Sequence, residues 1–232
     1  MSFWRTFLDL LLPRHCVVCD EELNSSETDI CNVCLCNVKH IRWESATDNP
    51  FLRRIWDKHD VEAAGSTLYY NSSADYHNIF IAIKYQHRPK VGYRLAQLSF
   101  PYWQNLGLAK DAVCIIPVPL SRTRMLKRGY NQAEWISKGI AKQTSIPVNN
   151  NILVRDKHIR TQTHKNATER WENTQNIFSV KKNAPDLNDK TILLVDDIAT
   201  TGATLCDCIR ALREGFPTIR VHVYTLGFTQ NE

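Results

Sequence analysis

Apolar positions beyond the first 62 residues follow two different periods. Continuous apolar runs at 112–116 and 191–195 are typical of strands that are buried on both faces. After each run come apolar residues at helical spacing, at 132–144 and at 202–214. The other predicted elements are strands at 66–70, 148–154 (the weakest pattern) and 219–226, and a helix at 74–86. Because strands alternate with helices, the sequence predicts an α/β fold with a mostly parallel sheet flanked by helices.

The first 62 residues have a different pattern. Apolar residues at 3–12 are interrupted by Arg5 and Asp9, which indicates an amphipathic helix and not a secretion signal. Pro50 discourages a continuous helix across residues 46–62, which predict a linker or a small helix. We therefore expect three parts: residues 1–45 with the amphipathic helix and a cysteine-rich module, 46–62 as a linker, and 63–232 as the α/β domain.

Composition and charge exclude few classes of protein. The 232 residues are 43% hydrophobic and 23% charged, which is ordinary for a soluble protein. A net charge of +5 permits a nucleic acid or another polyanion as partner, but it is also common in proteins that have none. No stretch approaches the roughly 18 apolar residues that a transmembrane helix needs. We therefore expect no transmembrane segment and a cytoplasmic location, with the periphery of the inner membrane as an alternative.

Five of the eight cysteines are clustered near the N-terminus. Two pairs have two residues between their members and eleven residues between the pairs; they are Cys16 with Cys19 and Cys31 with Cys34. Such paired turns bring four thiolates around one tetrahedral ion, and Zn²⁺ suits a closed set of four thiolates. The sequence therefore predicts a small zinc-ribbon-like module with a structural zinc ion. Two disulfides are the alternative, and we interpret Cys36 and His15 as bystanders.

The segment Leu193–Thr204 is the strongest candidate for ligand binding, because a buried strand there ends in two acids and a hydroxyl-rich turn follows. Proteins with parallel sheets bind anions at this point, where the backbone N–H groups of the next helix are free. Asp196 and Asp197 would repel a phosphate, so a ligand that carries both hydroxyl groups and a phosphate explains the combination. The alternative is that the acids end a strand and the threonines cap a helix.

The same twelve residues resemble the signature of type I phosphoribosyltransferases, in which four apolar residues and two acids precede Thr-Thr-Gly-x-Thr. The resemblance implies that the protein binds 5-phosphoribosyl 1-pyrophosphate (PRPP). It also implies that Asp196 and Asp197, the catalytic residues if the protein is an enzyme, hold the ribose hydroxyls. The loop residues expected to bind PRPP are Ala199, Thr200, Thr201, Gly202, Ala203 and Thr204.

A basic run follows the predicted strand at 112–116. Its members are Arg122, Arg124, Lys127 and Arg128. With Mg²⁺ they would meet the pyrophosphate of PRPP, and a solvated basic loop is the alternative. Residues 127–133, Lys-Arg-Gly-Tyr-Asn-Gln-Ala, resemble a motif of the ComF family of late competence proteins, and the four-cysteine module agrees with that family. The further residues expected to bind PRPP are Lys84, Pro117, Val118, Lys127 and Arg128.

Two functions follow from this resemblance. The ComF family is linked to DNA movement across the inner membrane during transformation, which implies a role in DNA uptake through binding of single-stranded DNA. Cations and aromatic rings suit such binding, and 122–130 and 155–171 supply both. The alternative is an active phosphoribosyltransferase that transfers ribose 5-phosphate to an unidentified acceptor and releases pyrophosphate. The amphipathic helix at 3–12 adds a hypothesis of docking to a competence helicase or a membrane surface, against packing on its own domain.

Overall fold

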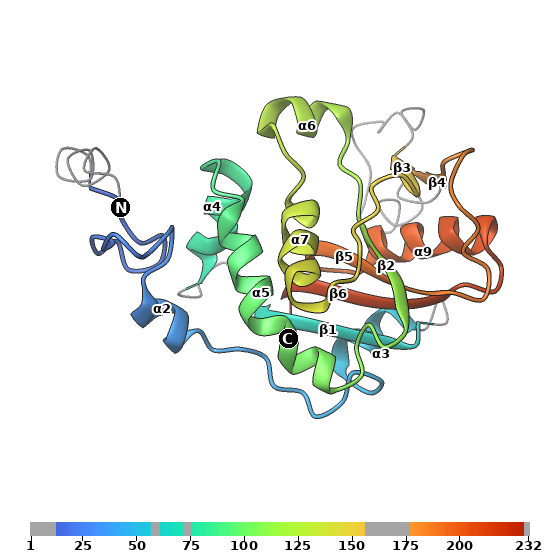
Figure 1. Ribbon diagram of the computed structural model, residues 1–232, viewed down its shortest axis with the longest axis horizontal. Coiled ribbons are helices and arrows are strands. Elements are labelled where there is room, and N and C mark those ends of the chain that lie inside the picture. The colour runs from blue at the N-terminus through green and yellow to red at the C-terminus, as the bar shows by residue number, and fades with distance from the viewer. Residues whose placement is uncertain (1–12, 57–60, 72–75, 156–176, 230–232) are drawn as a thin grey trace, which may run out of the picture.

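The computed structural model describes residues 13–56, 61–71, 76–155 and 177–229 (Figure 1). The amphipathic helix predicted at 3–12 and nearly all of the segment 155–171 lie outside these ranges. Within them, none of the helices has the length and hydrophobicity that crossing a lipid bilayer requires.

Four parallel strands form the central sheet, in the order β1, β6, β5, β2. Their bounds are β1 Ala63–Tyr69, β2 Ala112–Pro117, β5 Thr191–Ala199 and β6 Arg220–Phe228. Strand β5 has a neighbour on each side, and its residues 192–195 are completely buried, as their continuous apolar run predicts. A separate antiparallel sheet is formed by β3 (Leu153–Arg155) and β4 (Phe178–Val180).

Helices flank the central sheet (Figure 1). Their bounds are α3 Pro50–Trp56, α4 His77–Tyr85, α5 Lys90–Asn105, α7 Gln132–Thr144 and α9 Ala203–Gly215. The connection from β1 to β2 carries α5 across the sheet in one direction, and the connection from β5 to β6 carries α9 in the other. Because such crossovers are right-handed, α5 and α9 lie on opposite faces. Helix α7 packs along α5, and α3 packs against β1 and α9. The predicted α/β fold is confirmed.

Three elements differ from the pattern of the sequence. Strand β5 continues beyond residue 195 because its ladder with β6 extends to Ala199. The strand predicted at 148–154 is wrong for most of its length, since Val148 makes only an isolated bridge to Ile115 and the strand found there, β3, pairs with β4. Helix α5 was not predicted, because it contains Gly92 and Pro101, although its buried residues Val91, Leu95 and Trp103 follow helical spacing.

Residues 46–62 contain a helix that packs on the α/β domain. Asn49 precedes α3, and its side-chain amide donates a hydrogen bond of 2.8 Å to the carbonyl of Ala64 in β1. Phe51 and Ile55 of α3 are completely buried. Helix α3 is therefore part of the packed core and lies close to the loop that opens α9.

The N-terminal module consists of short turns and helix α2 (Asn32–Asn37), drawn in blue in Figure 1. Arg88, which follows α4, donates to the carbonyl of His15 at 3.1 Å and lies 4.0 Å from the carboxylate of Asp29. The hydroxyl of Tyr76 donates to the carbonyl of Asn37 at 2.7 Å. These contacts attach the module to the region around α4.

Candidate functional site

The carboxyl ends of β2 and β5 are neighbours in the sheet, and a cavity of about 270 Å³ lies there. From β5 and the loop after it, the lining residues are Asp196, Asp197, Ile198, Thr200 and Thr204. From the segment after β2 they are Val118, Pro119, Leu120, Arg124, Arg128, Asn131 and Gln132. Tyr70, Lys84 and Arg155 complete the described lining. Cavities at adjacent carboxyl ends of parallel strands are the usual place for a ligand in this fold class.

The two acids are held within strand β5. The backbone N–H of Asp197 donates to the carboxylate of Asp196 at 2.8 Å, and the N–H of Ile198 donates to the carboxylate of Asp197 at the same distance. The ammonium group of Lys84, at the end of α4, lies 3.3 Å from the Asp197 carboxylate, whose side chain is 16% exposed. Lys84 is thus the charged partner of Asp197, and it makes no ion pair of this length with Asp196.

The environment of Asp196 favours its neutral form. Burial raises the pKa of Asp196 to about 8, and the nearby charge of Asp197 acts in the same direction, whereas Lys84 opposes it. At neutral pH the Asp196 carboxyl therefore tends to keep its proton in the absence of a ligand. A ligand that brings a cation or hydroxyl donors to this place would favour the carboxylate, which accepts hydrogen bonds more strongly.

The loop between β5 and α9 turns at Gly202. This residue has a φ of +78°, and a Cβ atom placed on it would lie 2.8 Å from a methyl carbon of Ile55 in α3. The guanidinium of Arg54 donates to the carbonyl of Thr200 at 2.9 Å and also to that of Thr229. Helix α3 therefore supports the loop from outside the sheet, and helix α9 begins directly after the loop.

The opposite wall of the cavity begins directly after β2. The N–H of Val118 donates to the carbonyl of Val195 at 2.8 Å, and the buried amide of Asn131 donates to the carbonyl of Val118 at 2.9 Å. The basic run predicted from the sequence forms a short helix, α6 (Arg122–Arg128), between these two points. Arg124 and Arg128 reach the cavity from this helix.

The structure brings together part of the predicted ligand set. Those that line the cavity are Asp196, Asp197, Thr200, Thr204, Lys84, Val118 and Arg128. Those outside its lining are Pro117, Lys127, Ala199, Thr201, Gly202 and Ala203. Ala199 is buried and pairs with Phe228, and Gly202 shapes the loop by its backbone. Lys127 lines a second cavity beside the first.

Several lining residues were not among the predicted ligands. Asn131 and Gln132 belong to the motif at 127–133, so the sequence contained a signal for them. Arg155 is the last residue of β3 and is partly buried, and burial lowers its pKa while leaving the guanidinium charged. Tyr70 comes directly after β1, and only the topology of the sheet reveals that this strand end faces the cavity.

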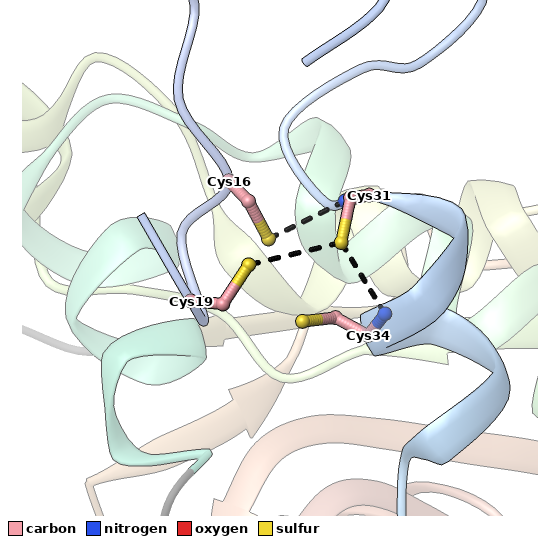
Figure 2. A group of neighbouring side chains, drawn as sticks. All are labelled: Cys16, Cys19, Cys31 and Cys34. Atoms are coloured by element: carbon pink, nitrogen blue, oxygen red, sulfur yellow. Dashed lines mark hydrogen bonds between the residues drawn. The ribbon is translucent and has the colours of Figure 1, made fainter. Parts of the chain in front are cut away.

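The four paired cysteines converge in the N-terminal module (Figure 2). Their sulfur atoms all lie within 4.8 Å of one another, and those of Cys19 and Cys31 are 3.8 Å apart. All eight cysteines lie in the described ranges and are free thiols, which agrees with a metal site and not with two disulfides. Cys36 is exposed and is not part of the cluster. Four thiol ligands at this spacing fit a metal ion with tetrahedral coordination.

Backbone N–H groups point at the sulfur atoms, as they do around bound thiolates. The N–H of Cys31 donates to the sulfur of Cys16 at 3.3 Å, and the N–H of Cys34 donates to that of Cys31 at 3.3 Å. Burial alone would raise the pKa of Cys16, but backbone donors from Cys19, Cys31 and Val18 outweigh it and bring the pKa down to about 7. The module thus stabilises negative charge on the Cys16 sulfur, which a metal ligand requires, whereas at Cys19 a backbone donor lowers the pKa but desolvation and neighbouring sulfur atoms raise it overall.

This arrangement of sheet, acidic strand end and anion loop is that of a phosphoribosyltransferase-type domain. The phosphoribosyl transferase domain family matches residues 108–229, more than half of the chain, and the chain belongs to this family. Competence protein F of Haemophilus influenzae is 41% identical over 100 residues, which are 43% of this chain and 44% of that protein. Competence protein ComFC of Bacillus subtilis is 34% identical over 112 residues, 48% and 43% of the two chains. These relatives and the domain match confirm the resemblance to the ComF family.

Other similar proteins cover more of the chain at lower identity. DNA utilization protein YhgH of Salmonella typhi is 30% identical over 146 residues, 60% of this chain and 62% of that protein. The chain spans about half the length of the curated relatives it matches first. Adenine phosphoribosyl transferase from Trypanosoma brucei is 18% identical and covers 80% of this chain and 63% of its own, with a TM-score of 0.36.

Proposed function

We propose that the cavity at the ends of β2 and β5 binds PRPP together with Mg²⁺. The observation that carries this proposal is that two acids, two threonines of the loop between β5 and α9, and three arginines line one cavity of about 270 Å³. A sugar that carries a phosphate at one end and a pyrophosphate at the other has groups for each of these features. Its volume is just below the roughly 300–1,000 Å³ that is common for small-ligand sites, and a cavity of about 440 Å³ adjoins it.

Each part of the ligand has residues that suit it. Asp196 and Asp197 would accept hydrogen bonds from the ribose hydroxyls, and the N-terminus of α9 with Thr200 and Thr204 would hold the 5-phosphate. The pyrophosphate would then lie towards α6, where Arg128 and Arg124 offer guanidinium groups. Mg²⁺ prefers oxygen ligands, and the carboxylates beside phosphate oxygens fit that preference.

We further propose that the protein acts in DNA uptake by binding single-stranded DNA. Its relatives carry the names competence protein and DNA utilization protein. Helix α6 adds a physical reason, because six of its seven residues are exposed and four of the seven are cations. A cationic surface of this kind binds phosphate backbones with an affinity that falls steeply as salt rises.

An active phosphoribosyltransferase is the second candidate function. Two carboxyl groups beside the ribose would stabilise positive charge at the anomeric carbon as pyrophosphate leaves, and the arginines of α6 would stabilise the leaving group. Release of pyrophosphate from PRPP on addition of candidate bases would favour this function. Its absence with a panel of purines and pyrimidines, under conditions where PRPP binds, would favour a binding role.

For the cysteine module we propose Zn²⁺ as the bound ion. Four sulfur ligands leave no open coordination position, which is the donor set of structural zinc sites. The module lies outside the cavity lining, so the role of the ion is to stabilise the fold of residues 13–41 and not to meet the ligand.

Isothermal calorimetry with PRPP and Mg²⁺ tests the main proposal. The double variant Asp196→Asn and Asp197→Asn keeps the shape of both side chains and removes both carboxylates that a bound ligand would meet. We expect a loss of affinity of about 150-fold to 25,000-fold, from two charge-assisted hydrogen bonds of about 1.5–3 kcal/mol each. The exposed Asp186→Asn is the matched control, because Asp186 bonds only within its own turn at Asn188. Equal affinity in the double variant and the wild type would refute the assignment.

A further inference from the structure

A second cavity, of about 440 Å³, lies beside the first between the end of α4 and helix α6. Its described lining consists of Lys84, Tyr85, His87, Arg124, Lys127 and Arg128. Lys84, Arg124 and Arg128 also line the first cavity, so the two cavities have a common wall. We call them the sugar cavity, at the ends of β2 and β5, and the cationic cavity, between α4 and α6.

The lining of the cationic cavity carries charge of one sign. Four of its six described residues are lysine or arginine, and none is an acid. Lys84 is paired with Asp197, but within the described ranges no acid lies at ion-pair distance from Arg124, Lys127 or Arg128. Like charges that face one space repel each other, and an anion bound between them would remove that repulsion. The cavity therefore favours a ligand with more than one negative charge.

The same cavity contains an aromatic ring that faces solvent. Tyr85 is 66% exposed, and the guanidinium carbon of Arg128 lies 5.5 Å from the centre of its ring. The ring of His87, which also lines this cavity, lies 6.3 Å from that of Tyr130 in an edge-to-face arrangement. An exposed tyrosine beside cations is the combination that stacks a base while the cations hold the neighbouring phosphates. A free phosphate or a lipid headgroup would make no use of the ring.

We propose that the cationic cavity binds a nucleotide unit of single-stranded DNA and that this binding is antagonistic to PRPP binding in the sugar cavity. The proposal rests on the proposed function of the sugar cavity. Its physical cause is the common wall: a pyrophosphate that neutralises Lys84, Arg124 and Arg128 leaves less positive charge for DNA and adds negative charge next to it. By thermodynamic linkage, bound DNA lowers the affinity for PRPP by the same factor.

Fluorescence anisotropy with a labelled oligothymidylate measures the antagonism. The oligonucleotide is titrated with the full chain in Mg²⁺, with and without saturating PRPP, and sodium sulfate matches the ionic strength of the two buffers. We expect PRPP to raise the Kd for DNA by roughly 5-fold to 150-fold, which is the usual range for coupling between two sites. Calorimetric titration with PRPP measures the Kd for PRPP with and without the oligonucleotide, and this Kd has to change by the same factor.

Variants separate the two cavities. Tyr85 lines only the cationic cavity, so Tyr85→Ala should weaken DNA by roughly 5-fold to 150-fold through the loss of stacking and leave the Kd for PRPP unchanged. Tyr85→Trp keeps an aromatic face and is the matched control, with DNA affinity close to that of the wild type. Arg128→Ala, in the common wall, should weaken both ligands and reduce the antagonism between them.

The outcomes distinguish this inference from the proposed function. If the wild type binds PRPP but PRPP leaves the Kd for DNA unchanged, the antagonism is refuted and the sugar cavity keeps its assignment. If the wild type binds no PRPP, the proposed function and the antagonism both fail. In that case the DNA site is still tested by Tyr85→Ala in buffer without PRPP, where unchanged DNA affinity refutes it. Equal affinity for a duplex of the same length would also refute a site that depends on stacking of an unpaired base.

Discussion

The cysteine module and the loop after β5 both present a small ligand site, but they are built in different ways. In the module few apolar side chains are buried, among them Leu23 and Ile30, and the chain is organised by turns that bring four sulfur atoms within 4.8 Å. The loop after β5 instead continues a strand that is buried between two others. We therefore expect the module to need a bound ion in order to fold, whereas the sheet supplies the scaffold for the second candidate site whether or not a ligand is bound.

This difference also explains why a strained backbone and a carboxyl with a raised pKa are found in the α/β domain. The sheet holds Gly202 at a positive φ against α3, and it holds Asp196 where burial raises the pKa of the carboxyl to about 8. Such features persist only where the surrounding structure determines them. The module has no comparable core to hold them, and its own costs, four thiolates close together, are relieved by the ion itself.

The largest expected effect is on the module. Cys31→Ser removes a central ligand, and we expect loss of the bound metal and unfolding of residues 13–41, because structural zinc contributes about 10–16 kcal/mol in isolated zinc modules. Metal analysis by mass spectrometry, with circular dichroism for the fold, is the measurement. The α/β domain should keep most of its helical signal and its thermal transition.

Cys36→Ser is the control for that experiment. Cys36 is exposed and lies outside the four-sulfur cluster, so its replacement should leave one metal ion per chain. Metal loss in both variants, or in neither, would contradict the assignment of ligands. Complete unfolding of the chain in Cys31→Ser would contradict the difference between the two regions.

The second effect, of intermediate size, tests the loop. Gly202→Ala places a Cβ at a positive φ and 2.8 Å from Ile55, which should destabilise the domain by about 2–5 kcal/mol. The matched control is Gly129→Ala, because Gly129 has nearly the same φ of +77° but open space around it, and about 1–2 kcal/mol is expected. Thermal unfolding measures both. If the two variants lose the same stability, α3 does not constrain the loop.

The third effect depends on pH and concerns Asp196; it is small for each pH unit and accumulates across the range. Its pKa in the folded protein, about 8, lies above the value of 3.8 for an unperturbed group, so the folded state binds the extra proton between these values. Stability should therefore fall as pH rises from about 4 to about 8, by at most about 1.4 kcal/mol per pH unit. Asp196→Asn removes this dependence and should be more stable than the wild type at pH 8. Urea denaturation at pH 5 and pH 8 measures the free energy of unfolding of both proteins. An equal loss of stability in the wild type and in Asp196→Asn would contradict the prediction.

The sequence predicted those parts of the fold that depend on local pattern. Helix α7 has the predicted bounds because an N-cap at Asn131 and a regular apolar face define it. The sequence predicted that the four sulfur atoms come together, because each pair of cysteines separated by two residues forms its own local turn. Helix α5 was missed because Gly92 and Pro101, both unfavourable inside a helix, lie within it, although the face that packs on α7 has helical spacing.

For the site, the sequence indicated the acids and the loop but not the whole wall. Asp196 and Asp197 are adjacent in sequence to the turn, so a motif contains them all. Tyr70 and Arg155 reach the cavity from other elements, and their contribution follows from strand order and from the position of β3. The raised pKa of Asp196 likewise depends on burial among distant residues and is invisible in a motif.

The support that α3 gives to the loop limits how the chain can be shortened. Arg54 and Ile55 contact the loop at Thr200 and Gly202, yet both precede the segment 108–229 that matches the domain family. Strand β1 precedes that segment as well and covers one edge of β6. A fragment trimmed to the matched boundaries would lose the brace beneath the anion loop and expose an unpaired apolar edge, and it should aggregate on expression.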